Sequence, residues 1–177
     1  LKSVRSAVWL SEGARPAVHA LKYEGLPRIA DDLAAAMGPL RPPTDGPSAL
    51  IPIPLARKRL RERGYNQSEV LARALARQWR IPLLNLLART RETPTQTALT
   101  PETRLANVRA AFAVANVQCS MINDHSTLNI EHSTLIIVDD VFTTGATLAE
   151  AARALEQAGA RRIYGVTFAR AAIPDFT

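Results

Sequence analysis

Residues 135–147 read LIIVDDVFTTGAT, and this stretch decides the fold class. Four apolar residues lead into two adjacent aspartates, and a turn of small residues follows. The helical pattern ATLAEAARALEQAG comes next at 146–159, and the apolar segment RIYGVTFA follows at 162–169. Strand, helix and strand within about thirty residues make a βαβ unit, which requires a parallel sheet. Because these strands are apolar without alternation, we predict an α/β domain whose sheet is covered on both faces.

Segments upstream of this unit have the patterns of further helices and strands. Residues 16–25 and 27–38 are predicted as helices, and a third helix begins at Asn66. Residues 49–55 have the pattern of a buried strand that contains two prolines. Since proline cannot donate a ladder hydrogen bond, this strand should end early or lie at an edge. Shorter strands or connecting segments are predicted at residues 81–88 and 110–115.

Composition and charge limit the classes of function. The 177 residues are 47% hydrophobic and 21% charged, which is typical of a globular domain. The net charge of +6 favours anionic partners such as phosphorylated metabolites or nucleic acid. The single cysteine, Cys119, excludes an internal disulfide and a multi-cysteine metal site within these residues. With no long apolar stretch and no leader pattern, we expect a cytoplasmic protein without membrane insertion. Since residue 1 is Leu, we expect the chain to continue upstream.

The turn after the two aspartates has the features of a phosphate-binding loop. It lies at the carboxyl end of a strand, where open α/β sheets bind their ligands. It also leads into a helix, whose N-terminal N–H groups and dipole attract anions. A glycine lets the backbone approach a ligand closely, and threonine hydroxyls can donate to phosphate oxygens. The residues assigned to phosphate binding are Thr143, Thr144, Gly145, Ala146 and Thr147.

Asp139 and Asp140 require a different partner, because carboxylates repel phosphate. Hydroxyl groups or a bound cation would suit them, and a sugar phosphate would satisfy both the acids and the loop. The alternative is a simple helix-capping turn preceded by two exposed acids. The chain contains neither a Gly-Lys-Ser/Thr loop nor a G-x-G-x-x-G pattern, so the common nucleotide loops are excluded.

The stretch VDDVFTTGAT resembles the phosphoribosyl pyrophosphate (PRPP) signature of type I phosphoribosyltransferases. The resemblance implies a mostly parallel central sheet flanked by helices, with residues 1–40 as a helical hood and 49–177 as the α/β core. It further implies that Asp139 and Asp140 bind the ribose hydroxyls while the threonine loop holds the 5-phosphate. Mg²⁺ would be held through bound PRPP, and no residue is assigned as a protein ligand to a metal.

Three further segments resemble the ComF family of competence-associated proteins: HALKYEG at 19–25, IPIPLARKRLRERGYNQSEVLARALA at 51–76 and TRLANVRAAFAV at 103–114. A cysteine-rich zinc ribbon usually precedes the domain in that family, and these residues contain none. The 6-oxopurine salvage enzymes usually carry an acid where Thr143 stands. Because a threonine cannot act as a general acid or base at neutral pH, salvage of hypoxanthine or guanine is disfavoured.

The stretch from Arg57 to Arg63 is strongly basic, with five cationic residues among seven. A run of charge is commonly a solvated face, and that reading stays open. The resemblance instead implies that this segment is a loop that approaches the pyrophosphate of PRPP. Arg57, Lys58 and Arg63 would then neutralise the diphosphate, with Mg²⁺ bridging its oxygens.

Residues 90–107 are rich in threonine, proline and charge, and we predict a long loop there. The resemblance implies that it is a flexible catalytic loop that closes over the substrate. Arg104 and Arg109 are the assigned catalytic residues, with Asn107 beside them. The alternative is a disordered surface loop without a catalytic role.

Two classes of function follow from the resemblance. In the first, the chain is a PRPP-binding protein of the competence system that handles incoming single-stranded DNA, with other competence proteins as partners. In the second, it is an Mg²⁺-dependent phosphoribosyltransferase that transfers ribose 5-phosphate from PRPP to an unidentified acceptor. An enzyme needs an acceptor pocket beside the ribose site, whereas DNA binding needs a basic surface with a salt-dependent affinity.

Overall fold

A computed structural model of the chain describes residues 1–23, 28–90, 111–114 and 129–172. A four-stranded sheet forms the centre, and every neighbouring pair of strands is parallel. Across the sheet the strands are β1 (Ser3–Trp9), β6 (Arg162–Arg170), β5 (Thr134–Phe142) and β2 (Ser48–Pro52). The predicted strand, helix and strand of the C-terminal unit are therefore confirmed, and so is the α/β fold class.

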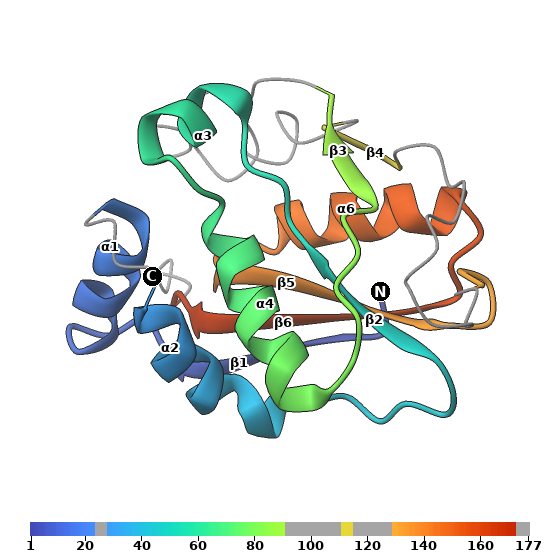
Figure 1. The fold of residues 1–177 in the computed structure, drawn as a ribbon, viewed down its shortest axis with the longest axis horizontal. Helices are drawn as coiled ribbons and strands as arrows, with labels where there is room; N and C mark the ends of the chain where they lie inside the picture. Colours follow the sequence, from blue (N-terminus) through green and yellow to red (C-terminus); the bar gives the residue numbers. More distant parts are fainter. Residues whose placement is uncertain (24–27, 91–110, 115–128, 173–177) are drawn as a thin grey trace, which may run out of the picture.

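Helices cover both faces of this sheet, as the apolar strands require (Figure 1). On one face α2 (Ile29–Met37) and α4 (Gln67–Trp79) pack in a core that contains Ile136 and Val138 of β5. On the other face α6 (Ala146–Gln157) packs in a second core that contains Leu135 and Ile137. Alternate residues of one strand thus enter opposite cores, which is why β5 shows no polar alternation.

Smaller elements complete the fold around the sheet. The antiparallel hairpin of β3 (Leu87–Arg89) and β4 (Phe112–Val114) packs beside α6. A short 3₁₀ turn, Gly38–Leu40, follows α2. Helices α1 (Ala14–Tyr23) and α3 (Arg57–Arg63) lie toward the end of the sheet at which β5 and β6 finish (Figure 1). These two helices therefore stand near the edge where ligands of parallel sheets bind.

The structure corrects two expectations about local elements. Residues 3–9, expected within a helical hood, form strand β1, which pairs with β6 along its whole length. The segment 57–63, expected as a loop, is helix α3, which ends at Gly64 in the left-handed conformation. Strand β2 behaves as predicted, because it ends at Pro52 and is the last strand of the sheet. Within the described residues, no helix is both long and apolar enough to cross a membrane.

Candidate functional site

A cavity of about 300 Å³ opens at the carboxyl edge of the sheet. Five parts of the chain line it: the end of β5 with the loop that follows, the residue after β1, helix α1, the segment around α3 and the start of α4, and strand β3. The polar lining includes Lys22, Arg59, Arg63, Asp139, Asp140 and Thr143. The two acids and part of the threonine loop, both assigned from the sequence, are therefore brought together in one cavity.

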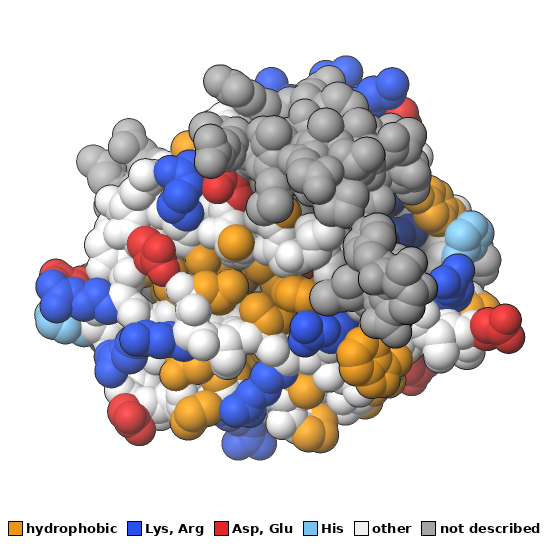
Figure 2. Space-filling model, turned by 180° about the vertical axis from the view of Figure 1, so that it is seen from behind, with side chains coloured by type: hydrophobic (Ala, Val, Ile, Leu, Met, Phe, Trp, Pro, Cys, Tyr) orange, Lys and Arg blue, Asp and Glu red, His pale blue; other side chains and the backbone are white. Residues whose placement is uncertain are grey.

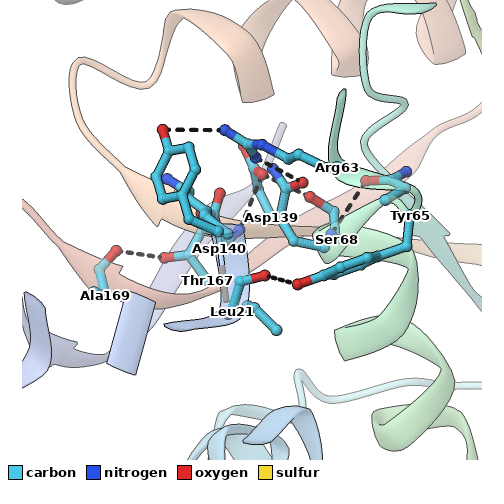
Figure 3. Close-up of polar contacts among 12 residues, drawn as sticks. Leu21, Arg63, Tyr65, Ser68, Asp139, Asp140, Thr167 and Ala169 are labelled. Carbon is cyan, nitrogen blue, oxygen red and sulfur yellow. Dashed lines mark hydrogen bonds and ion pairs between the residues drawn. The ribbon is translucent and has the colours of Figure 1, made fainter. Parts of the chain in front are cut away.

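Asp139 is buried at the base of this cavity and is held in place by short contacts (Figure 3). Its Oδ1 accepts a hydrogen bond from Ser68 Oγ at 2.9 Å and another from the backbone N–H of Asp140 at 2.9 Å. Burial raises the pKa of Asp139 to about 7, and the neighbouring Asp140 carboxylate adds to the rise. Asp139 is thus a carboxyl group that changes protonation state near neutral pH.

Asp140 has a cationic partner that the sequence did not reveal. Lys22 Nζ, from α1, lies 2.6 Å from Asp140 Oδ2, and the carboxyl is 7% exposed. The ion pair places a positive charge beside the two adjacent buried carboxyls. Both acids lie within β5, which continues to Phe142, and Lys22 of α1 contacts Asp140 there. The alternative of two exposed acids is therefore wrong.

Consecutive residues of α1 connect the helix to the site. Leu21 accepts a hydrogen bond through its carbonyl from the Tyr65 hydroxyl, next to the Lys22 ion pair (Figure 3). Tyr23 accepts a hydrogen bond from Arg63 at 3.3 Å, and the Arg63 guanidinium lies 4.8 Å from the centre of the Tyr23 ring. Residues 19–23 and 63–67 are therefore in contact, and together they form one wall of the cavity.

The loop after β5 is built as a phosphate site requires. Gly145 has φ +78°, a value that L side chains rarely adopt, and it caps the N-terminus of α6. A Cβ at this position would lie 2.9 Å from the Phe142 ring, so only glycine fits. Thr143 and Thr147 line the cavity, whereas Thr144 Oγ1 accepts a hydrogen bond at 3.4 Å from the N–H of Ala146. Thr144 therefore stabilises the turn itself.

The cations of α3 divide between the cavity and the solvent. Arg63 lines the cavity and also donates to Gln67 Oε1 at 3.1 Å. Arg57 and Lys58, assigned to pyrophosphate from the sequence, are exposed and lie outside the lining. Arg59, which the sequence did not single out, lines the cavity in their place. Arg59 and Arg63 are four residues apart and share one face of the helix, whereas Arg57 and Lys58 lie on other faces, and a run of five cations carries no signal of that phase.

A second cation absent from the sequence assignments is Arg89, on β3. Burial lowers its pKa, and the nearby Arg59 guanidinium lowers it further. Three arginines from two separate elements, Arg59 and Arg63 of α3 and Arg89 of β3, thus face the same cavity as the two acids. The catalytic assignments Arg104 and Arg109, and the neighbouring Asn107, lie outside the described residues.

Asp139 and Asp140 are the only acidic residues among the described ones that line the cavity. Among the described residues, no cluster of three or more histidine, cysteine or acidic side chains could hold a metal ion. Mg²⁺ prefers six oxygen ligands and readily shares them with phosphate groups. Two carboxyls are too few to form a Mg²⁺ site by themselves. They fit a cation whose other oxygen ligands come from a bound phosphate compound.

Comparison with known proteins places this geometry in a family. The Phosphoribosyl transferase domain family matches residues 66–174. Competence protein F of Haemophilus influenzae is 36% identical over 71% of this chain and 51% of its own length. The DNA utilization protein YhgH of Escherichia coli K12 is 34% identical over 66% of this chain and 47% of its own. Competence protein ComFC of Bacillus subtilis is 36% identical over 62% of this chain and 39% of its own.

These relatives confirm the resemblance to the ComF family. The chain spans about half the length, or less, of the curated relatives it matches. Among solved structures, a hypoxanthine phosphoribosyltransferase from Staphylococcus aureus superposes with a TM-score of 0.41 and 16% identity, over 86% of this chain and 74% of that chain.

Proposed function

This chain belongs to the phosphoribosyl transferase domain family, and we propose that its cavity binds PRPP. One observation carries the proposal: the acid pair, the α6 phosphate loop and the α3 arginines line the same cavity. PRPP carries a ribose diol, a 5-phosphate and a 1-diphosphate. Each of the three groups then has a complementary partner in the lining.

The residues divide these tasks according to their charge. The N-terminus of α6, with the Thr143 and Thr147 hydroxyls, holds the 5-phosphate. Asp139 and Asp140 accept hydrogen bonds from the ribose hydroxyls, and Lys22 holds the Asp140 carboxyl in position for that role. Arg59 and Arg63 attract the diphosphate. A Mg²⁺ ion held between the diphosphate and an aspartate would offset the repulsion between carboxylates and ligand.

The wider role of the protein is in the handling of DNA. The relatives are named as competence and DNA utilization proteins, and the net charge of +6 suits a polyanionic partner. On the face shown in Figure 2, Lys and Arg side chains are spread singly between apolar and acidic ones. Because Lys22, Arg59, Arg63 and Arg89 all line the cavity, we place the contact with single-stranded DNA near the carboxyl edge of the sheet, with other competence proteins as partners.

Isothermal titration calorimetry tests the PRPP proposal. PRPP with Mg²⁺, ribose 5-phosphate and pyrophosphate are titrated separately into the protein, and PRPP should bind most tightly. Asp139→Ala combined with Asp140→Ala should abolish binding of PRPP and ribose 5-phosphate. Asp31→Ala with Asp32→Ala removes an adjacent acid pair on the exposed side of α2, and this matched control should bind like the wild type. Equal PRPP affinity in both double variants would refute the proposed site.

A second candidate function is transfer of ribose 5-phosphate to an acceptor, and the specific observation in its favour is Asp139. A buried carboxyl with a pKa of about 7 in a cavity is typical of a group that takes part in catalysis. Release of pyrophosphate from PRPP is the assay, with bases, amines and oligonucleotides offered as acceptors. Turnover with one acceptor class identifies an enzyme, and tight binding without turnover with any of them supports the binding protein.

A further inference from the structure

The last residues of three neighbouring strands form a row of aromatic, cationic and aromatic side chains. In the sheet register Arg170 of β6 lies opposite Trp9 of β1 on one side and Phe142 of β5 on the other. The Arg170 guanidinium lies 4.6 Å from the centre of the Phe142 ring and 6.0 Å from that of Trp9. We call these three residues the edge row. Its members stand at the carboxyl edge of the sheet because each is the final residue of its strand.

Trp9 is the most exposed large apolar side chain among the described residues, at 64%. The core gains little from it, because an indole that is two-thirds in solvent buries a small part of its surface. Phe142, by contrast, packs against the α6 core and takes the closer contact with Arg170. Most of the indole surface therefore stays open next to a fixed positive charge.

The edge row continues directly into the cavity. Leu10 follows Trp9 in the chain, Thr143 follows Phe142, and both Leu10 and Thr143 line the cavity. A strand of nucleic acid that reaches the phosphate loop would thus pass the indole. An exposed aromatic ring beside a cation is the combination that single-stranded nucleic acid uses, since the ring stacks on a base and the cation attracts the backbone.

We propose that the edge row is a base-stacking subsite for single-stranded DNA, in which Trp9 stacks on one nucleobase and Arg170 contacts the adjacent phosphate. The subsite rests on the proposed DNA-handling role and is independent of PRPP turnover. It binds with little sequence preference, because every base offers a π-face. Because stacking requires a base, the subsite should bind an abasic sugar–phosphate strand more weakly than a strand that carries bases.

Tryptophan fluorescence reports on this subsite selectively. The chain has two tryptophans, and Trp79 is 5% exposed with its indole N–H donating to the Gly38 carbonyl at 3.1 Å. Stacking of a base on an indole quenches its emission, so quenching by DNA should come from Trp9 alone. Oligothymidylate should quench the wild type, whereas an abasic oligonucleotide of the same length should not. Trp9→Phe should lose the quenching and retain most of the affinity, because phenylalanine also stacks.

Fluorescence anisotropy with labelled oligothymidylate then measures the contribution to affinity. Trp9→Ala should weaken binding about 5- to 100-fold, the range for loss of one base–aromatic stack. Val8→Ala, the matched control, truncates a neighbouring exposed side chain of β1 and should bind like the wild type. The affinity of Trp9→Ala for PRPP should be unchanged, which separates the subsite from the cavity.

The outcomes distinguish failure of the subsite from failure of the proposed function. If oligothymidylate binds without quenching, or if the abasic strand binds and quenches equally, the base-stacking subsite is refuted while DNA binding stands. If no oligonucleotide binds, the DNA-handling role fails, and the subsite fails with it. If PRPP alone does not bind, the cavity assignment fails, and the edge row is judged by the oligonucleotide results.

Discussion

Replacing Asp139 with asparagine should make the protein more stable at alkaline pH. The pKa of Asp139 rises from its ordinary value of 3.8 to about 7 in the fold, chiefly because the carboxyl is buried. The folded state therefore holds a proton that the unfolded chain releases, and stability falls as the pH rises from about 4 to about 7. At about 1.4 kcal/mol per pKa unit, the full loss is on the order of 4 kcal/mol.

Asparagine removes this loss without removing the local hydrogen bonds. Its side-chain oxygen can still accept from Ser68 Oγ and from the N–H of Asp140. Asp139→Asn should thus match the wild type near pH 4 and exceed its free energy of unfolding by roughly 4 kcal/mol at pH 8.5. Urea denaturation at a series of pH values measures the difference. Parallel pH dependences for the two proteins would refute the assigned burial of a titrating carboxyl.

Asp140→Asn is the matched control for that experiment, because it should act in the opposite direction. Near pH 5.5 Asp139 is protonated, and Asp140→Asn deprives Lys22 of the partner that lies 2.6 Å away. The lost pair is partly buried, so we expect a destabilisation of about 1–3 kcal/mol. Stabilisation by both substitutions at that pH would mean that Lys22 does not pair with Asp140.

Three further outcomes follow from the structure. Gly145→Ala should destabilise the fold by about 1–3 kcal/mol and weaken ribose 5-phosphate binding, because it adds a clash with Phe142 to the backbone strain. Gly64 has φ +79° and open space around it, so Gly64→Ala should lower the free energy of unfolding in urea by the backbone strain alone. In calorimetry Arg59→Ala should weaken PRPP binding about tenfold or more, as expected for one charge-assisted hydrogen bond. Arg57→Ala should leave the affinity unchanged, because Arg59 lines the cavity and Arg57 does not. The affinity for oligothymidylate, measured by anisotropy, should fall with salt at a log–log slope of about −0.7 per phosphate contacted; a slope of zero would exclude an electrostatic interface.

The C-terminal βαβ unit was predictable because local sequence specifies it almost completely. The residues of β5 that enter the two hydrophobic cores are all apolar, and the amphipathic helix α6 begins directly after Gly145. The same stretch contains Asp139, Asp140 and residues 143–147, so this part of the candidate site could be assigned from the sequence alone. Gly145 was assigned for close approach of the backbone to a ligand, and its φ of +78° is a second reason for glycine that the structure adds.

The rest of the cavity lining depends on contacts between segments that are distant in the sequence. Strand β1 was missed because its sequence, SVRSAVW, becomes a strand through pairing with β6, more than 150 residues away. The role of Lys22 depends on how α1 lies over β5, which no local pattern encodes. The choice of Arg59 over Arg57 and Lys58 depends on the helical phase of α3, and the sequence reading had treated that segment as a loop.

The central claim is that PRPP occupies the cavity between α1, α3 and the loop of residues 143–147. A crystal structure of the protein grown with PRPP and Mg²⁺ tests it most directly. We predict that the 5-phosphate lies against the N-terminus of α6, that the ribose hydroxyls contact Asp139 and Asp140, and that the diphosphate faces Arg59 and Arg63. Clear density for PRPP at another place on the molecule, with the acid pair still joined to Lys22, would contradict the account.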